Sequence, residues 1–208
     1  MLSISFDGLT IAYQRAGSGP PLVLLHGFIC DSRSWKHQIP GLSRDFDVIA
    51  WDTPGCGASS DTGEQHSMGE YADTLAAFLD QIGVESTHFC GLSWGGTLSL
   101  EFYRRYPERV RSLVLADTYA GWAGSLGSEA AEARLARCLR ESELPPEEWV
   151  PQWAPEAFSP DAPQEMTTTT PGSCGTPPRG VPGDVEGRGR RLQRHSAEHR
   201  CAHAADLG

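Results

Sequence analysis

Long apolar runs, paired cysteine motifs and an excess of basic residues are all absent from this sequence. No stretch of about 18 apolar residues occurs, and the N-terminus, MLSISFDGLT, has neither the basic nor the apolar segment of a signal peptide. The net charge of −10 disfavours nucleic acid and anionic membranes as partners. We therefore expect a cytoplasmic protein, and the oligomeric state stays open.

The cysteines do not form a metal-binding or disulfide pattern. None of the six belongs to a CxxC pair, so neither a zinc cage nor a disulfide framework is indicated in a chain of 208 residues. We expect free thiols. The six cysteines are Cys30, Cys56, Cys90, Cys138, Cys174 and Cys201.

Residues 1–118 alternate short β-rich runs with helix-length periodic segments, which predicts an α/β fold with a mostly parallel sheet between helices. Asp7-Gly8 separates the first two runs and predicts an antiparallel N-terminal hairpin. Ser67 and Glu70 form a capping box ahead of a helix. The predicted strands are 1–6, 9–15, 21–26, 46–51, 86–91 and 110–116, and the predicted helices are 34–42, 67–82, 94–106 and 129–140.

The C-terminal part has a different character. Residues 145–158 are rich in proline and tryptophan, which is compatible with a mobile cover over a pocket. Residues 166–208 contain few apolar side chains and many glycines and prolines. Such a segment cannot bury enough surface to offset its ordering entropy, so we expect a disordered tail.

The strongest chemical signal is Gly91-Leu92-Ser93-Trp94-Gly95-Gly96, where a predicted strand ends and a helix begins. In the pattern G-x-S-x-G, a serine sits on a strained, tight turn that lifts its hydroxyl above the sheet, and the flanking glycines make room for that turn. Ser93 is therefore the candidate nucleophile.

A second motif, Leu24-Leu25-His26-Gly27-Phe28, ends the third predicted strand. Gly27 lets the backbone pass close to a substrate, and the N–H groups of Phe28 and Trp94 form a candidate pair for a developing oxyanion. We interpret His26 as a buried, hydrogen-bonded residue that shapes this substrate loop, in preference to a general base.

The third motif is Trp51-Asp52-Thr53-Pro54-Gly55-Cys56-Gly57-Ala58-Ser59, which leaves the fourth predicted strand as a turn. These three motifs, each at the end of a strand, resemble the α/β-hydrolase family, specifically its small serine hydrolases. The resemblance covers about residues 8–158. It implies acyl transfer from a small-molecule substrate to water through an acyl-enzyme on Ser93, with no metal or organic cofactor. It also implies that Asp52 organises its loop and lies outside the catalytic triad.

The resemblance also implies a division of the chain. Residues 1–118 would form the hydrolase core, 119–165 a partial cap, and 166–208 the disordered tail. Relatives with an aspartate nucleophile, such as epoxide hydrolases, are disfavoured because the position is Ser93. The tryptophans Trp35, Trp51, Trp94 and Trp122 are interpreted as core or pocket lining in preference to specificity residues.

The remaining triad members do not follow the family pattern. The family places its acid after the seventh strand and its histidine after the eighth, which would lie beyond about residue 200. The histidines after Ser93 are His195, His199 and His203, all in the predicted tail, and we do not expect any of them to be the base. Asp117 is a weak candidate acid, and a polar residue lining the pocket is the stronger interpretation.

One hypothesis accounts for the tail. If the final residues CAHAADLG are written back into codons and read one base further on, degenerate codons permit Val-Pro-Thr-Leu-Leu-Ile-Trp-Gly, which resembles the family's seventh strand. This suggests a frameshift between about residues 165 and 178, to be tested by reading the coding DNA. The sheet would then be incomplete, with about six strands, and 110–116 would be an aggregation-prone edge.

Three functions remain open. The first is a serine hydrolase acting on esters, lactones, activated C–C bonds or similar small acyl substrates. The second is a catalytically inactive fragment whose Ser93 has no base. A lyase on the same fold would share the serine and cannot be separated from the first by sequence.

Overall fold

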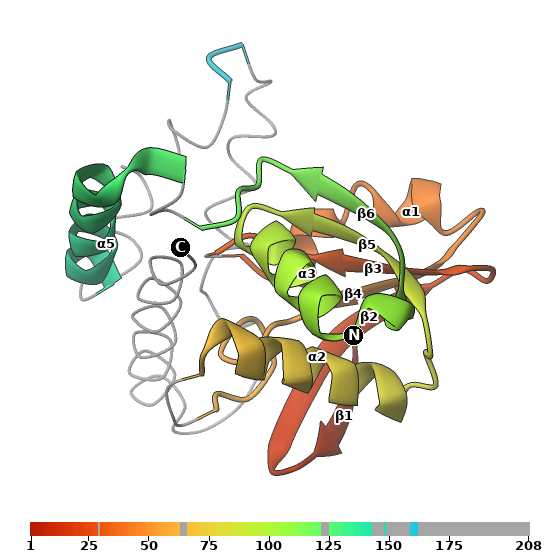
Figure 1. Cartoon of the computed structure of the whole chain (residues 1–208). Coiled ribbons are helices and arrows are strands. Elements are labelled where there is room, and N and C mark those ends of the chain that lie inside the picture. Colours follow the sequence, from red (N-terminus) through yellow and green to blue (C-terminus); the bar gives the residue numbers. More distant parts are fainter. Residues whose placement is uncertain (29, 63–65, 122–124, 143–147, 149–158, 162–208) are drawn as a thin grey trace.

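A six-stranded sheet forms the centre of the computed structural model, which describes residues 1–28, 30–62, 66–121, 125–142, 148 and 159–161 (Figure 1). The strand order is β1-β2-β4-β3-β5-β6. β1 and β2 pair antiparallel, β2 also runs antiparallel to β4, and the other neighbours are parallel. The strands are β1 (Leu2–Phe6), β2 (Leu9–Ala16), β3 (Pro21–Leu25), β4 (Asp47–Trp51), β5 (Thr87–Leu92) and β6 (Val110–Ala116).

The predicted N-terminal hairpin is confirmed, and the geometry of its turn explains why Asp7 and Gly8 occupy it. Asp7 has φ 48° and Gly8 has φ 79°, so both central residues lie in the left-handed region that a type I′ turn requires. Phe6 pairs with Leu9 directly across this two-residue turn.

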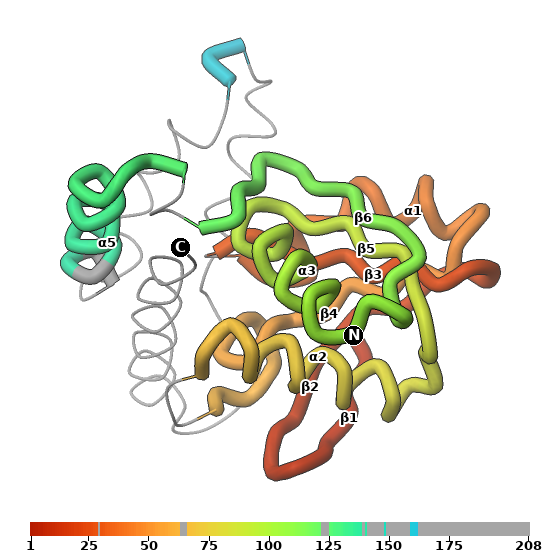
Figure 2. The backbone as a smooth tube through the Cα atoms, in the orientation of Figure 1, coloured from red at the N-terminus to blue at the C-terminus, as the bar shows by residue number. Residues whose placement is uncertain are grey.

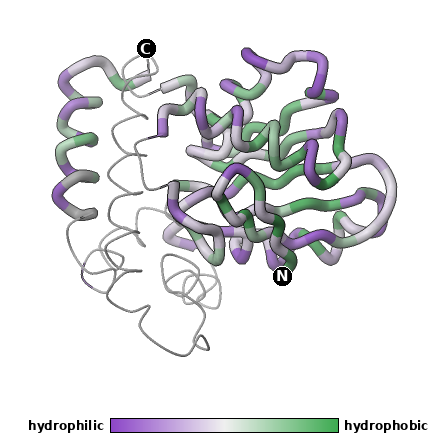
Figure 3. The backbone as a smooth tube through the Cα atoms, turned by 90° about the horizontal axis from the view of Figure 1, so that it is seen from below, coloured by the Kyte–Doolittle hydropathy of each residue, from purple (hydrophilic) through white to green (hydrophobic). Residues whose placement is uncertain are grey.

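Helices cover both faces of the sheet. α2 (Met68–Gln81) and α3 (Trp94–Arg105) pack on one face over the larger apolar core, which includes Ile49, Leu75 and Phe89. The short segments η1 (Ser32–Trp35) and α1 (Ile39–Leu42) cover the other face over a smaller core. Figure 2 traces this layering along the backbone, and Figure 3 shows the apolar residues gathered along the strands.

The capping box predicted for α2 is present. The Glu70 amide donates to the Ser67 hydroxyl at 3.2 Å, and the Ser67 amide donates to the Glu70 carboxylate at 2.7 Å. These two bonds satisfy amides that the first helical turn would otherwise leave unpaired. After the last turn, Gly83 adopts φ 74° and the chain leaves the helix toward β5.

The segment predicted as one short helix over 34–42 is instead two separate turns, η1 and α1. Asp31 starts the first turn early, because its carboxylate accepts the Arg33 amide at 2.9 Å. Pro40 has no amide hydrogen and cannot donate to the carbonyl of Lys36, so a continuous helix through this position is disfavoured.

Two further helical segments complete the described chain. η2 (Pro107–Arg109) follows α3, and α5 (Ser128–Ser142) stands apart from the sheet in Figure 1. The predicted cover at 145–158, apart from the isolated residue 148, and the predicted tail at 166–208 lie outside the described residues, so the proposed division at 118 and 165 stays a prediction. Among the helices that are described, none is long and apolar enough to cross a membrane.

Candidate active site

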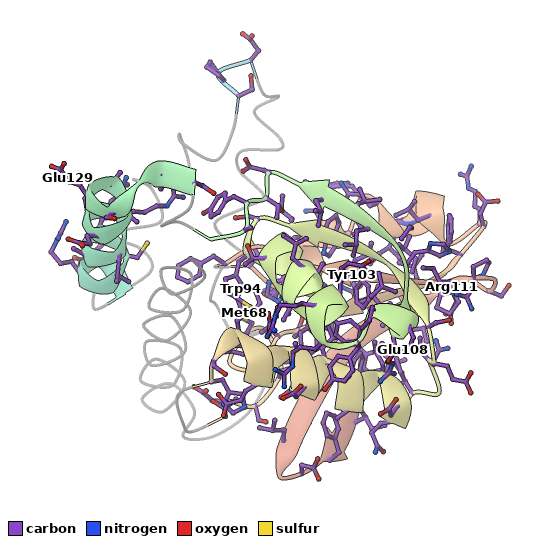
Figure 4. All side chains as sticks on the ribbon, in the orientation of Figure 1. Met68, Trp94, Tyr103, Glu108, Arg111 and Glu129 are labelled. Atoms are coloured by element: carbon purple, nitrogen blue, oxygen red, sulfur yellow. The ribbon has the colours of Figure 1, made fainter. Side chains whose placement is uncertain are left out.

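Loops from the parallel strands converge on the end of the sheet where α3 begins. Trp94, the first residue of α3, and Met68, the first residue of α2, lie toward this end in Figure 4, whereas Tyr103 lies toward the other end of α3. The carboxyl ends of parallel strands are where open α/β sheets place their ligand sites. The three sequence motifs all map to loops at this end.

Ser93 occupies the turn between β5 and α3. Its φ of 52° and ψ of −115° are rarely adopted by a residue with a side chain, and the surrounding contacts must hold this conformation in place. The Ser93 amide donates to the carbonyl of Ala116 on β6 at 2.9 Å. No hydrogen bond joins the Ser93 hydroxyl to another described residue, so this part of the chain leaves it available to a reactant.

The glycines around Ser93 are required by close backbone contacts. A Cβ atom on Gly91 would lie 2.5 Å from the Gly95 carbonyl oxygen, and one on Gly95 would lie 2.6 Å from the His26 carbonyl oxygen and overlap that of Leu25. The start of α3 therefore lies directly against the end of β3. This contact brings the Ser93 turn beside the loop that carries Gly27 and Phe28.

Gly27 itself has a different environment. A Cβ atom there would make only ordinary contacts with Leu92, 3.7 Å or more away, so the described protein atoms do not require glycine at this position. Its predicted role in letting a substrate approach the backbone stays a prediction.

His26 is 1% exposed and lies in the hydrogen-bond network that joins two of the motif loops. Its Nδ1 donates to the carbonyl of Gly27 at 2.8 Å, and its Nε2 accepts the amide of Thr53 at 3.1 Å, which identifies the Nδ1–H tautomer. Both ring nitrogens are thus engaged with backbone groups. This geometry agrees with the expectation that His26 shapes the loop.

Asp52 has the same kind of surroundings. Its carboxylate is fully buried and accepts the amides of Ser32 at 2.8 Å and Ala58 at 2.9 Å. Gly57, with φ 53°, leaves the space that this carboxylate fills. Asp52 therefore ties the loop after β4 to η1, which agrees with the loop-organising role that the family resemblance implied.

The candidate acid Asp117 directly follows β6, has φ 47° and is exposed. The Asp117 side chain makes no hydrogen bond with another described residue. His195, His199 and His203 lie outside the described residues, so the structure does not bring a histidine and an acid together at Ser93 within the part that it describes.

Aromatic side chains line the interior next to the Ser93 turn. Trp94 is buried, and the Tyr71 ring meets it edge-on at 5.2 Å between centroids. The His66 ring meets Tyr71 at 5.5 Å. Trp35 and Trp51 are also buried, as predicted, whereas Trp122 lies outside the described residues.

Two residues near the site were missed by the sequence analysis. His66 lies between the third motif and α2, and its buried Nδ1 has no hydrogen-bond partner among the described residues. Thr118 follows β6, and its hydroxyl lies 3.3 Å from the carbonyl oxygen of Ser93. Neither belongs to a motif. Thr118 is revealed by its contact with the distant residue Ser93, and His66 by its buried ring nitrogen and its ring contact with Tyr71.

A cysteine thiol lies close to Ser93 in the sequence. Burial raises the pKa of the Cys90 thiol, which lies three residues before Ser93, and therefore disfavours the nucleophilic thiolate. Cys30, Cys56, Cys90 and Cys138 form no disulfide bond within the part of the chain that the structure describes, while Cys174 and Cys201 lie outside it. No group of three or more potential metal ligands occurs among the described residues.

Several curated proteins are similar to part of this chain in sequence. Bifunctional epoxide hydrolase 2 from Mus musculus is 36% identical over 114 residues, which is 53% of this chain and 21% of that protein. A putative carbamate hydrolase, RutD, from Azorhizobium caulinodans is 35% identical over 127 residues, or 61% of this chain and 44% of the relative. The chain thus spans less than half the length of these two curated relatives.

Solved structures extend the similarity. A hydrolase from Pseudomonas aeruginosa matches with a TM-score of 0.70 and 26% identity, covering 99% of this chain and 72% of that one. A thermophilic esterase from Thermogutta terrifontis matches with a TM-score of 0.67 and 27% identity, covering 99% and 69%. The sequence model of the alpha/beta hydrolase fold family matches residues 20–167, which contain all three motifs. Together with the sheet and the Ser93 turn, this match shows that the chain belongs to the α/β-hydrolase family.

Proposed function

We propose that this protein is a serine hydrolase that acts on esters, lactones or similar small acyl substrates through an acyl-enzyme on Ser93. The backbone of Ser93 carries the proposal, because a serine with φ 52° at a strand-to-helix turn lifts its hydroxyl toward the loops. The similarity to an esterase and to other hydrolases supports this substrate class. Epoxide hydrolysis is disfavoured, despite the sequence similarity to an epoxide hydrolase, because the nucleophile position in this chain is a serine.

In the proposed reaction, the Ser93 oxygen attacks the acyl carbon while its proton passes to a base. The carbonyl oxygen becomes an oxyanion, which the amides of Phe28 and Trp94 stabilise. The alcohol then leaves with a proton, and water releases the acid from Ser93. His26 does not act as the base, since both of its ring nitrogens face backbone groups.

Labelling with a fluorophosphonate probe tests the proposal. At pH 7.5 we expect the full chain to be labelled, and Ser93→Ala to lose labelling by about 100-fold or more, because a serine reacts only when a base accepts its proton. Ser3→Ala is the matched control, since Ser3 is an exposed serine on β1, and its labelling should be unchanged.

The alternative is a catalytically inactive hydrolase fragment that lacks a base for Ser93. It predicts no labelling of protein that circular dichroism shows to be folded. That result, or equal labelling of the wild type and Ser93→Ala, contradicts the proposed function.

A further inference from the structure

The segment that follows β6 folds over the Ser93 turn. Asp117 adopts φ 47° and turns the chain back immediately after the strand. Residues 116–119 then make three contacts with the start of α3: Ser93 N–H to Ala116 O at 2.9 Å, the Thr118 hydroxyl to Ser93 O at 3.3 Å, and the Thr97 hydroxyl to Tyr119 O at 3.0 Å. This segment is therefore part of the support for the nucleophile.

The Thr118 side chain also packs closely against Gly96 in the first turn of α3. A Cβ atom on Gly96 would lie 2.6 Å from the Thr118 methyl carbon and would overlap its hydroxyl oxygen. The last glycine of the motif thus leaves space for Thr118, whereas Gly91 and Gly95 leave space for backbone. The threonine side chain sits against the first turn of α3 beside Ser93.

The Ser93 carbonyl belongs to the same planar peptide unit as the Trp94 N–H, the proposed oxyanion donor. This carbonyl also accepts the amides of Gly96 at 2.9 Å and Thr97 at 3.1 Å, which come from the helix itself. The Thr118 hydroxyl contacts the same carbonyl from outside the helix. Hydrogen bonds at the carbonyl end of a peptide unit fix its plane and polarise its N–H.

We propose that Thr118 is a positioning residue, whose hydroxyl holds the Ser93–Trp94 peptide so that the Trp94 N–H points at the developing oxyanion. This inference rests on the proposed function and deepens it. The benefit would appear in the transition state, because a donor that is already oriented costs no reorganisation when charge develops.

A purely structural role is the competing explanation. The Thr118 hydroxyl also lies 3.0 Å from the carbonyl oxygen of Ala116, so it can close its own turn without influencing Trp94. The experiment must therefore separate turn stability from peptide orientation.

Three variants make that separation. Thr118→Val removes the hydroxyl with little change in shape, and Thr118→Ser restores it without the methyl group. Thr97→Val is the matched control, because the Thr97 hydroxyl joins the same helix to the same segment through Tyr119. Its hydroxyl donates to the Tyr119 carbonyl and not to the Ser93 carbonyl.

With p-nitrophenyl butyrate as substrate, we expect Thr118→Val to lower kcat about tenfold and leave KM within about twofold, because the lost orientation affects the transition state. Thr118→Ser should recover most of kcat, and Thr97→Val should keep it within about twofold. Equal loss of kcat in Thr118→Val and Thr97→Val, or a change confined to KM, would overturn the proposal.

A second measurement does not need activity. In ¹⁵N-labelled protein, the Trp94 amide resonance should shift in Thr118→Val, return in Thr118→Ser and stay in place in Thr97→Val. An unmoved Trp94 resonance in Thr118→Val contradicts the positioning role. If the wild type fails to react with the fluorophosphonate while this shift is present, the proposed function fails and the proposed contact stands.

Discussion

The buried carboxylate of Asp52 holds the loop after β4 through hydrogen bonds to the backbone. It accepts two backbone amides, from Ser32 and Ala58, and it is fully buried. We expect Asp52→Ala to lower the free energy of unfolding by about 2–4 kcal/mol, because both amides would lose a charged acceptor. Urea denaturation followed by circular dichroism measures this change.

Asp45→Ala is the control for Asp52→Ala, since Asp45 is an exposed aspartate in the segment just before β4. Its effect should stay within about 0.5 kcal/mol. If Asp52→Ala were no more destabilising than Asp45→Ala, the loop would not depend on this carboxylate.

Individual residues differ in how far their surroundings could be predicted. His26 was expected to be a buried residue that shapes its loop, and Asp52 was expected to organise its loop; their hydrogen bonds agree with these expectations. Thr118 was not predicted, because its partner Ser93 lies 25 positions earlier in the chain. A contact of this kind leaves no periodic or motif signal in the sequence.

At the scale of elements, β6 ends the sheet within the described part of the chain and exposes large apolar side chains. Val114 is 55% exposed and Leu115 is 42% exposed. An apolar edge strand pairs readily with another copy, and a lysine on such an edge opposes pairing. We expect Val114→Lys to reduce self-association, measured by static light scattering across a concentration series.

Tyr103→Lys provides the comparison, because Tyr103 is 49% exposed and lies on α3 instead of on the strand. It removes a similar apolar surface and adds the same charge. Equal reduction of scattering by both variants would mean that charge alone, and not the β6 edge, controls association.

Elements with local signals were predicted closely. The Asp7-Gly8 turn and the Ser67–Glu70 capping box each involve neighbours in the chain, and both are present. The predicted helix at 34–42 was wrong in its continuity, because Pro40 and the early cap at Asp31 outweighed its apolar pattern. The swapped positions of β3 and β4 in the sheet were not predicted.

For the whole molecule, the charge balance leads to a prediction about pH. With 27 acidic and 17 basic residues the chain carries a net charge of −10 near pH 7, and its isoelectric point is about 5.1. Lowering the pH protonates carboxylates and removes the mutual repulsion between molecules. Turbidity should therefore be greatest near pH 5, and a minimum at that pH would contradict this expectation.

The sequence by itself determined the strand and helix types, the tight hairpin turn and the residue that occupies the strand-to-helix turn as Ser93. These follow from periodicity, capping and glycine spacing, which act between residues close together in the chain. Only the tertiary structure decided the order of the strands, the burial of Asp52 and the contact of Thr118 with Ser93. Those features depend on which distant segments pack together. That packing is set by the total free energy of apolar burial and hydrogen bonding over the whole sheet and its helices.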